Sequence, residues 1–450
     1  MNQTIQDAQT IFQAALSDVD PEGLIHQKLS LEGSILTVQA DGEPLTFDLD
    51  QYHRILVVGV GKASARMALG VEQVLGTRIT DGLVAVKYGH TEPTSRVRLI
   101  EAGHPVPDAK SVEAARSIVS LCRDADEKTL VINLISGGGS ALMCCPYSES
   151  GLSLEDKQQV TQALLACGAE IQEINCIRKH LSGVKGGRLA QALYPADSLN
   201  LILSDVVGDH LDAIASGLTA PDPSSFSQAV AIVDKYKIHD ALPPKVLDFL
   251  TRGSKGEIPE TPGASDPAFG KTRNMLIGSN FQALKAARSK ARDLGYNAII
   301  LSSQMTGEAR EAAKFYLGIA SEQLRNRTLA PTPACIIAGG ETTVTMKGDG
   351  TGGRNQEMAL AFLNELKNRP ELHDHVVFLS GATDGNDGPT DAAGGIASAH
   401  GLEAAREAGV NLQRYLDTND SYNALEQSEA LLKTGPTNTN VCDVQVLIVT

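Results

Sequence analysis

The sequence predicts a two-domain α/β protein, and three observations carry this expectation. Residues 55–75 read as an apolar strand, a glycine turn and a helix, which is half of a βαβ unit. Residues 129–135 form a continuous apolar run, typical of a strand buried in a parallel sheet. Residues 253–269 are rich in Gly, Pro and Ser, and strands alternate with helices again after them. We therefore expect a Rossmann-like three-layer α/β/α domain with a mainly parallel sheet over 1–252, a linker over 253–269, and a smaller α/β domain over 270–450.

Composition and charge narrow the possible functions. The chain has 450 residues, of which 42% are hydrophobic and 21% charged, as is ordinary for a globular protein. Its net charge of −15 argues against a general nucleic-acid surface, so an anionic ligand needs a local cationic pocket. No apolar run approaches the ~20 residues that a membrane-spanning helix needs. We expect a cytoplasmic protein with neither a nucleic-acid nor a membrane partner.

The seven cysteines form no CxxC pair and no zinc-ligand spacing. Most of them lie in apolar segments, which favours buried free thiols. The N-terminus has no Lys or Arg before Lys28, which argues against a secretory signal.

The N-terminal segments predict a helix and then a hairpin. Apolar residues recur at helical spacing from Ile5 to Leu16. Residues 29–49 alternate between apolar and polar side chains around Asp41-Gly42, which is typical of two strands joined by a turn.

The glycine turn at Gly59-Val60-Gly61 places Lys62 at the start of the next helix. The turn is not a P-loop, which needs Gly where Leu56 stands, and it is an incomplete dinucleotide fingerprint, because Ser64 replaces the third Gly. Lys62 stands where a phosphate would lie over a helix N-terminus. A lysine at a helix start can also simply be solvated.

The apolar strand 129–135 runs directly into three consecutive glycines. Glycines after a buried strand favour a nest of N–H groups for an anion over a simple turn. The segment 173–190 then concentrates basic side chains, which suit a carboxylate or phosphate ligand, although a solvated basic helix is the alternative. The residues expected to bind substrate or phosphate here are Ser136, Gly137, Gly138, Gly139, Ser140, Arg178 and Lys185.

Carboxylates follow two further predicted strands. The strand 199–203 leads to Asp205 and Asp209, at the edge where α/β sheets bind ligands. These side chains could face magnesium or merely cap a helix. The strand 376–379 leads into a loop with Asp384 and Asp387, where the Asp-Gly pairs could also simply make turns. These four aspartates are the candidate metal ligands.

A second glycine-rich loop, 348–353, follows an expected strand at Thr342–Met346 and precedes an expected helix that starts at Arg354. Glycines ahead of a helix let the backbone approach an anion closely, and Arg354 adds a cation with a fork suited to phosphate. Gly352 and Gly353 complete the expected phosphate-binding set. The alternative is an ordinary glycine-rich turn with a solvated Arg354.

Eight motifs span nearly the whole chain. They are GVGKAS at 59–64, AGHPVPD at 102–108, SGGGSAL at 136–142, IRKHLSGVKGGRLA at 177–190, LSDVVGDHLDAIASG at 203–217, GGRNQE at 352–357, TDGNDGPTDAAG at 383–394 and TGPTNTNVCD at 434–443. In this order they resemble the motifs of one family, the class II glycerate kinases, which are glycerate 2-kinases of the MOFRL type; some members have the older label hydroxypyruvate reductase.

The resemblance implies transfer of phosphate from ATP to the 2-hydroxyl of D-glycerate, with Mg2+ or another divalent cation, in a cleft between two domains. It also implies that Lys62 and Arg354 are the catalytic pair. The residue that would orient or deprotonate the hydroxyl stays open among Asp205, Asp384 and Asp391. Two rival functions are an NAD(P)H-dependent hydroxypyruvate reductase and a non-catalytic sugar-acid sensor. A homodimer is open beside a monomer.

Overall fold

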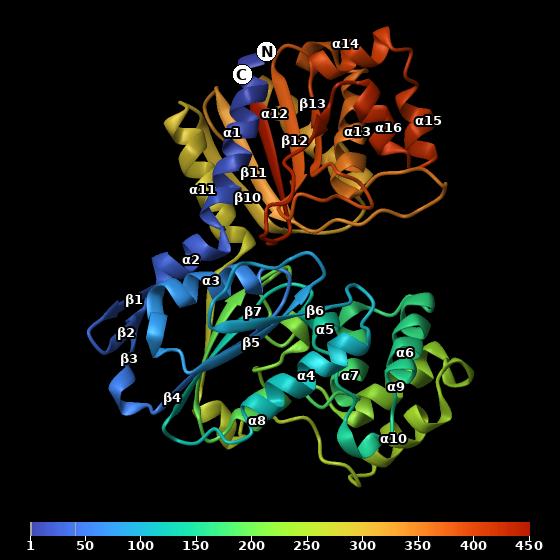
Figure 1. The fold of residues 1–450 in the computed structure, drawn as a ribbon. Coiled ribbons are helices and arrows are strands. Elements are labelled where there is room, and N and C mark those ends of the chain that lie inside the picture. Colours follow the sequence, from blue (N-terminus) through green and yellow to red (C-terminus); the bar gives the residue numbers. More distant parts are fainter. Residues whose placement is uncertain (1, 41) are drawn as a thin grey trace. The chain divides into compact units, whose positions relative to one another are not determined.

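The computed structural model describes residues 2–40 and 42–450, and these divide into two compact units. We call Pro21–Ile277 the parallel-sheet unit, and Met1–Asp20 together with Gly278–Thr450 the mixed-sheet unit (Figure 1). Both are α/β structures, as expected. The expected boundaries at 252 and 270 differ from this division, because the first helix belongs with the C-terminal part and the expected linker belongs with the N-terminal part.

The parallel-sheet unit is built on six strands in the order β6-β5-β4-β7-β8-β9. The registers from β6 through β8 are parallel, so the carboxyl ends of these strands lie at one edge. The strands are β4 (Arg54–Val60), β5 (Asp81–Lys87), β6 (Val97–Ala102), β7 (Thr129–Ile135), β8 (Asp197–Leu203) and β9 (Thr272–Gly278). The expected Rossmann-like sheet is confirmed, and its central strands are apolar because both faces are covered.

Helices cover both faces of this sheet. Leu56, Val58 and Val60 of β4 point to a core shared with α4 (Ala109–Leu121), α5 (Gly139–Leu142) and α8 (Arg188–Leu193). Helix α3 (Ser64–Leu75), which packs beside α2 (Pro21–Lys28), lies on the other face (Figure 1). The alternation of side chains along the strands thus produces the three layers.

A helical cluster completes the parallel-sheet unit. It contains α6 (Leu154–Ala166), α7 (Ile171–His180), α9 (Phe226–Tyr236) and α10 (Pro244–Ser254) around one apolar core. The expected linker 253–269 packs onto this cluster: Glu260 accepts hydrogen bonds from the Phe226 N–H at 3.1 Å and lies 3.0 Å from His180 Nε2. Its Pro and Gly content therefore reflects irregular but bound backbone, and the linker expectation is wrong.

A small antiparallel sheet precedes β4. Its strands are β1 (Leu29–Glu32), β2 (Ile35–Val38) and β3 (Leu45–Asp48), so the segment expected to be a hairpin holds one strand more. The turn expected at Asp41-Gly42 falls between β2 and β3 in the sequence, and Asp41 lies outside the described residues.

The mixed-sheet unit has the strand order β10-β11-β15-β12-β13-β14. Strand β10 pairs in parallel with β11, and the other pairs are antiparallel. The strands are β10 (Asn297–Met305), β11 (Ala334–Gly340), β12 (Val376–Ala382), β13 (Gly394–Ala397), β14 (Leu431–Leu432) and β15 (Asp443–Val449). The strand expected at Thr342–Met346 is absent from the described residues, where Thr343 makes only an isolated bridge to Glu308.

Helices α1 (Asn2–Asp18) and α11 (Asn280–Asp293) lie on one face of the mixed sheet, and α12 (Ala309–Asn326) and α13 (Arg354–Leu366) on the other (Figure 1). Tyr296 donates a hydrogen bond to Asp7 at 2.6 Å, and Thr439 donates one to the Val19 carbonyl at 2.7 Å. These contacts tie α1 to this unit although it opens the chain. The remaining helices are α14 (Ala399–Glu407), α15 (Leu412–Asp417) and α16 (Ser421–Gln427).

Two expectations about the whole chain can be compared with the structure. The seven cysteines are free thiols, five of them buried. In the described part of the chain, no helix is long and apolar enough to cross a membrane.

Candidate active site

The turn that carries Lys62 is bonded to the glycine loop after the neighbouring strand. Lys62 N–H donates to the Gly137 carbonyl at 2.9 Å, and Ala63 N–H donates to Ser136 Oγ at 3.1 Å. Ser64 Oγ lies 3.0 Å from the same hydroxyl. Parallel pairing of β4 with β7 brings these two turns together at the carboxyl edge of the sheet.

Ser136 is buried and its hydroxyl is occupied by these contacts, so the structure does not support the expected contact between Ser136 and a phosphate. Gly61, with φ of 141°, faces the Ser136 side chain so closely that a Cβ there would overlap it. Gly61 and Ser136 thus fix the position of Lys62.

Three side chains converge on the backbone of Gly137 and Gly138. A Cβ on Gly137 would overlap the carboxylate of Asp205, which follows β8. A Cβ on Gly138 would lie 2.9 Å from His104 Cδ2 and 3.3 Å from Lys62 Cγ. Glycine is required at positions 137 and 138, because the side chains of Asp205, His104 and Lys62 lie directly against the main chain there. The structure therefore brings the predicted residues Lys62 and Asp205 together, and it places His104, which was not predicted, beside them.

The N–H groups of Gly137 and Gly138 make no hydrogen bond to another described residue. Together with the Lys62 side chain they surround the position where the sequence predicts that an anion binds; we call this group of residues the cradle. Gly139 contributes less, because it begins α5 and packs closely on Ala215.

The imidazole of His104 is the uncharged member of this group of side chains. Burial, together with the positive charges of Lys62 and Lys87 and the proximity of His90, lowers the pKa of His104 to about 4. Its imidazole is therefore uncharged at neutral pH and cannot serve there as a cationic phosphate ligand. Sequence reasoning passed over His104, although it lies in the AGHPVPD motif directly after β6.

Lys185 has an internal role. Its side chain is buried, and Nζ donates to the carbonyls of Ser140 and Met143, at the end of the short helix α5. Burial lowers the pKa of Lys185. The Ser140 hydroxyl lies 2.8 Å from Ser216 Oγ, so it too has a partner inside the protein. These contacts give Lys185 an internal role, in which its side chain stabilises the loop that carries the cradle.

Arg178 is in a different position. Its guanidinium is half-buried, and it makes no hydrogen bond or ion pair with another described residue. Burial lowers the pKa of Arg178. Helix α7 places Arg178 near Cys144 and Lys185. Arg178 therefore remains a candidate to bind the carboxylate of a substrate.

Asp209 is the second candidate ligand after β8. It lies in a turn with φ of 55°, and burial raises its pKa. Within the described residues no group of three or more His, Cys, Asp or Glu side chains is suited to hold a metal. A magnesium ion with one or two carboxylate ligands and the remainder from nucleotide phosphates fits Asp205 better than a site made by the protein alone.

In the mixed-sheet unit, Arg354 is the first residue of α13 and is held by two carboxylates. Its Nε and Nη2 donate to Asp443 at 2.6 and 2.8 Å, and Nη1 lies 3.1 Å from Glu341. The Asp443 side chain is fully buried, whereas that of Arg354 is 30% exposed. The alternative of a solvated Arg354 is thus wrong. Neither Asp443 nor Glu341 was singled out from the sequence.

Asp387 caps α13. Its carboxylate accepts hydrogen bonds from the N–H groups of Asn355 at 3.1 Å and Gln356 at 2.8 Å, and from the Gln356 side chain at 3.0 Å. Both oxygens are occupied and the side chain is 1% exposed, so the expectation of a metal ligand is wrong for Asp387. Burial raises the pKa of Asp443, and the nearby carboxylate of Asp384 adds to this rise. Asp384 accepts a hydrogen bond from the Asn386 N–H at 3.1 Å.

The second glycine loop packs against the protein itself. Asn419 accepts hydrogen bonds from the N–H groups of Lys347 at 2.6 Å and Gly348 at 3.1 Å, and Asp420 accepts one from Thr351 at 3.0 Å. A Cβ on Gly352 would overlap the Ser421 side chain, and one on Gly353 would overlap Asp387. These glycines are needed for internal packing, and an anion cradle at 348–353 is not supported.

Asp391 forms an exposed ion pair with Lys433 at 2.9 Å and accepts a hydrogen bond from Tyr422 at 2.8 Å. These two partners lower its pKa, which makes it a weak base. Asp391 is therefore a poor candidate for orienting a substrate hydroxyl by accepting its proton.

Comparison with known proteins covers almost the whole chain. Residues 7–251 match the family described as "Domain of unknown function (DUF4147)", and residues 334–443 match the MOFRL family. The chain is 43% identical over 393 residues to a D-glycerate 2-kinase of Thermotoga maritima, covering 87% of this chain and 89% of the relative. It is 42% identical over 399 residues to a glycerate 2-kinase of Pyrococcus horikoshii, with 88% of each chain covered.

A third relative, from Agrobacterium vitis, has the name putative hydroxypyruvate reductase; the identity is 40% over 398 residues, with 88% of this chain and 87% of the relative covered. The fold is similar to that of a crystal structure of glycerate kinase from Thermotoga maritima, with a TM-score of 0.85 and 38% identity over the full length of both chains.

Proposed function

The chain belongs to the glycerate 2-kinase family, and from this premise we propose that it transfers the terminal phosphoryl group of ATP to the 2-hydroxyl of D-glycerate. The products are 2-phosphoglycerate and ADP. The observation that carries the proposal is the convergence of Lys62 and Asp205 on the free N–H groups of Gly137 and Gly138. Phosphoryl transfer needs positioning and charge neutralisation of this kind more than covalent chemistry.

The cradle binds phosphate oxygens in this mechanism. The N–H groups of Gly137 and Gly138 donate to them, and the Lys62 ammonium compensates their negative charge. In the reaction the 2-hydroxyl oxygen of glycerate bonds to the γ-phosphorus and the bond from that phosphorus to the β-phosphate oxygen breaks. ADP leaves with that oxygen, and the hydroxyl proton is released to solvent. Lys62 stabilises the transition state, because the negative charge of the transferring phosphoryl group lies on the outer oxygens of that group.

Asp205 is the carboxylate that we assign to the divalent cation. Magnesium, when bound, neutralises charge on the nucleotide phosphates and orients them. Asp205 fits this ligand role because its carboxylate lies against Gly137, beside the cradle. Arg178 is proposed to hold the substrate carboxylate, since its guanidinium forms no ion pair with another described residue.

Arg354 is proposed to be the second catalytic cation. Asp443 and Glu341 use three of its donors and fix its orientation, while part of its side chain remains exposed. The guanidinium has five N–H donors, so two remain for a ligand. A double variant with Lys62 then tests whether both cations act on one transferring group.

The reductase alternative lacks support at the site. A reductase needs a group that delivers a proton to the carbonyl oxygen. The only histidine on the cradle within the described residues is His104, whose pKa is lowered to about 4 by burial and by neighbouring cations. It is a poor proton donor at neutral pH. The sensor alternative is less favoured because the chain has both Lys62 and Arg354, the catalytic pair that the family resemblance implies; binding of D-glycerate without turnover would support a sensor.

The proposal includes a cytoplasmic location and a homodimer. Seven free thiols suit a reducing compartment, which is also where ATP is available to a kinase.

The test is a coupled assay with ATP and D-glycerate, run beside hydroxypyruvate with NADH or NADPH. Enolase alone should convert the kinase product to phosphoenolpyruvate. A product that first requires phosphoglycerate mutase would show transfer to the 3-hydroxyl, and turnover only with the nicotinamide cofactor would overturn the kinase.

A further inference from the structure

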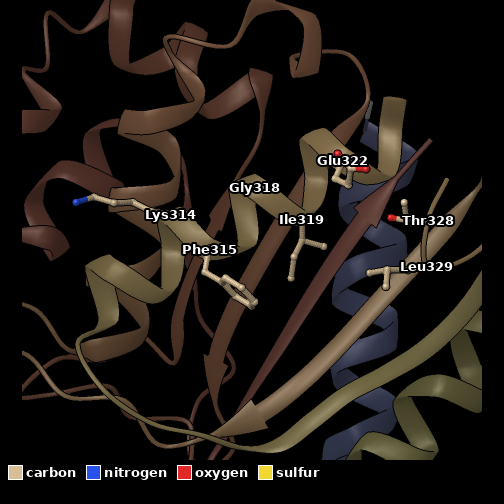
Figure 2. A pocket seen from close by; sticks show the side chains of 7 residues that line it. All are labelled: Lys314, Phe315, Gly318, Ile319, Glu322, Thr328 and Leu329. Atoms are coloured by element: carbon tan, nitrogen blue, oxygen red, sulfur yellow. The ribbon is translucent and has the colours of Figure 1, made fainter. Parts of the chain in front are cut away.

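The exposed face of α12 carries an apolar hollow bordered by charges. The hollow has a volume of about 490 Å³ and lies between this helix and the residues that follow it, Thr328 and Leu329 (Figure 2). Phe315 is 57% exposed and Leu329 is 42% exposed. Figure 2 shows Phe315 and Ile319 projecting from the same side of the helix, near this hollow.

The charges on this face are arranged symmetrically about Gly318. Lys314 and Glu322 lie four positions before and after it, and Glu311 and Arg325 lie seven positions before and after it. All four are exposed. In an antiparallel pair of identical helices related by a two-fold axis at Gly318, each residue faces the one at the same distance on the other side of 318. Lys314 then faces Glu322 of the second copy, and Glu311 faces Arg325 of the second copy. Each of these four charges thus meets a charge of opposite sign.

The apolar residues fit the same arrangement. Positions three and four apart share a helix face, so Phe315 of one copy lies at the height between Ile319 and Glu322 of the other. Those two residues line the hollow. A protruding ring beside a hollow that can receive it is the self-complementarity that a two-fold interface needs.

Gly318 lets the two helices approach each other. Nothing lies within 4 Å of a Cβ built at this exposed position, so the fold of one chain does not require glycine there. Glycine in the middle of an 18-residue helix is unfavourable by itself. It becomes useful where two helix backbones meet.

We propose that the exposed face of α12 is a homodimer interface, in which two copies of this chain pack their α12 helices antiparallel around Gly318. A contact based mainly on one helix pair is at the small end of interface sizes, so the dimer should dissociate on dilution. This proposal concerns assembly and is independent of the reaction catalysed.

Charge reversal tests the pairing. Analytical ultracentrifugation of the full chain over roughly a hundredfold concentration range should show a monomer–dimer equilibrium. Lys314→Glu alone, or Glu322→Lys alone, should raise the dissociation constant roughly tenfold or more, because each creates two like-charge contacts per dimer. The double variant Lys314→Glu/Glu322→Lys should restore dimerisation. Lys285→Glu, which reverses the charge of an exposed lysine on α11, is the matched control and should leave the dissociation constant unchanged.

A second variant tests the close approach without depending on charge. Gly318→Gln should leave the melting temperature of the monomer unchanged or raised, yet weaken the dimer roughly tenfold or more. Wild-type protein that stays monomeric throughout the series overturns the proposal, even if this face captures another protein. A dimer that survives Gly318→Gln, or charge reversals that the double variant does not rescue, would place the interface elsewhere and also overturn it.

Discussion

The buried carboxylate of Asp443 accepts two hydrogen bonds from the guanidinium of Arg354, at 2.6 Å from Nε and 2.8 Å from Nη2. Asp443 is the first residue of β15, paired with Gly340 of β11 on one side and Ala382 of β12 on the other. The central strands of the mixed sheet therefore determine where Arg354 points. This pairing makes Arg354 a structural as well as a proposed catalytic residue.

Arg354→Ala should destabilise the fold, because it leaves Asp443 buried without its cation. The expected loss is about 3 kcal/mol, the lower end for a broken buried pair, since Arg354 is partly exposed. Arg406→Ala breaks an exposed pair with Glu403 and serves as the matched control; it should change the free energy of unfolding little, because exposed ion pairs contribute little. Urea unfolding measures both. Equal stability of the two variants would contradict the role of the Asp443 pair.

Lys62→Ala should lower turnover by roughly 10²–10⁴-fold, the effect of losing one electrostatic contact in an active site. It should leave the melting temperature nearly unchanged, because the bonds that fix the turn come from the backbone and from Ser136. If both cations act on one phosphoryl group, the double variant Lys62→Ala/Arg354→Ala should lose less turnover than the two single variants together predict. Steady-state kinetics with thermal melts test this; near-normal turnover of Lys62→Ala would exclude Lys62 from catalysis.

Chelation with EDTA should abolish turnover, and magnesium should restore it. Asp205→Asn should raise the magnesium concentration needed for half-maximal rate, because it replaces a charged ligand by a neutral one. Asp391→Asn removes a carboxylate from an exposed ion pair and should leave that concentration unchanged. A magnesium dependence that Asp205→Asn does not shift would remove Asp205 from the metal site.

Asp387 should make the fold less stable as the pH rises from about 4 to 6. Burial raises its pKa from 3.8 to about 6, so the folded chain binds this proton more tightly than the unfolded chain. The stabilisation is complete below the unfolded pKa and is lost as the pH rises through the folded one, by about 3 kcal/mol. The unfolding free energy of wild type, relative to Asp387→Asn, should therefore fall over this range. A difference that stays constant with pH would contradict the raised pKa.

His104→Asn should reduce kcat/KM by the same factor at every pH from 6 to 8. The imidazole has a pKa of about 4 and is neutral throughout that range, so its loss removes a contact and no ionisation. We expect a reduction of roughly tenfold, from less precise positioning of Lys62 and the cradle. The pH–rate profiles of the two proteins measure this. An ionisation between pH 6 and 8 that disappears in the variant would show that His104 titrates during turnover.

Local patterns in the sequence predicted the central strands and the turns that carry the proposed first half of the site, whereas the strand expected at Thr342–Met346 is absent from the described residues. Continuous apolar runs identified β4 and β7, and the glycines after them identified the turns that meet at the carboxyl edge of the sheet. Lys62 and the cradle of Gly137 and Gly138 follow directly, because parallel pairing brings the ends of neighbouring strands together. The eight motifs also determined the family by themselves.

Only the tertiary structure decided which charged residues are free to bind a ligand. Lys185 looks like Arg178 in the sequence, but one is buried against the carbonyls of α5 and the other has no ion pair in the described chain. Asp443 stands 89 positions from Arg354, and their contact arises from the strand order of the mixed sheet. The physical reason is that periodicity and turn residues act locally, whereas the burial and partner of a charge depend on segments distant in the sequence.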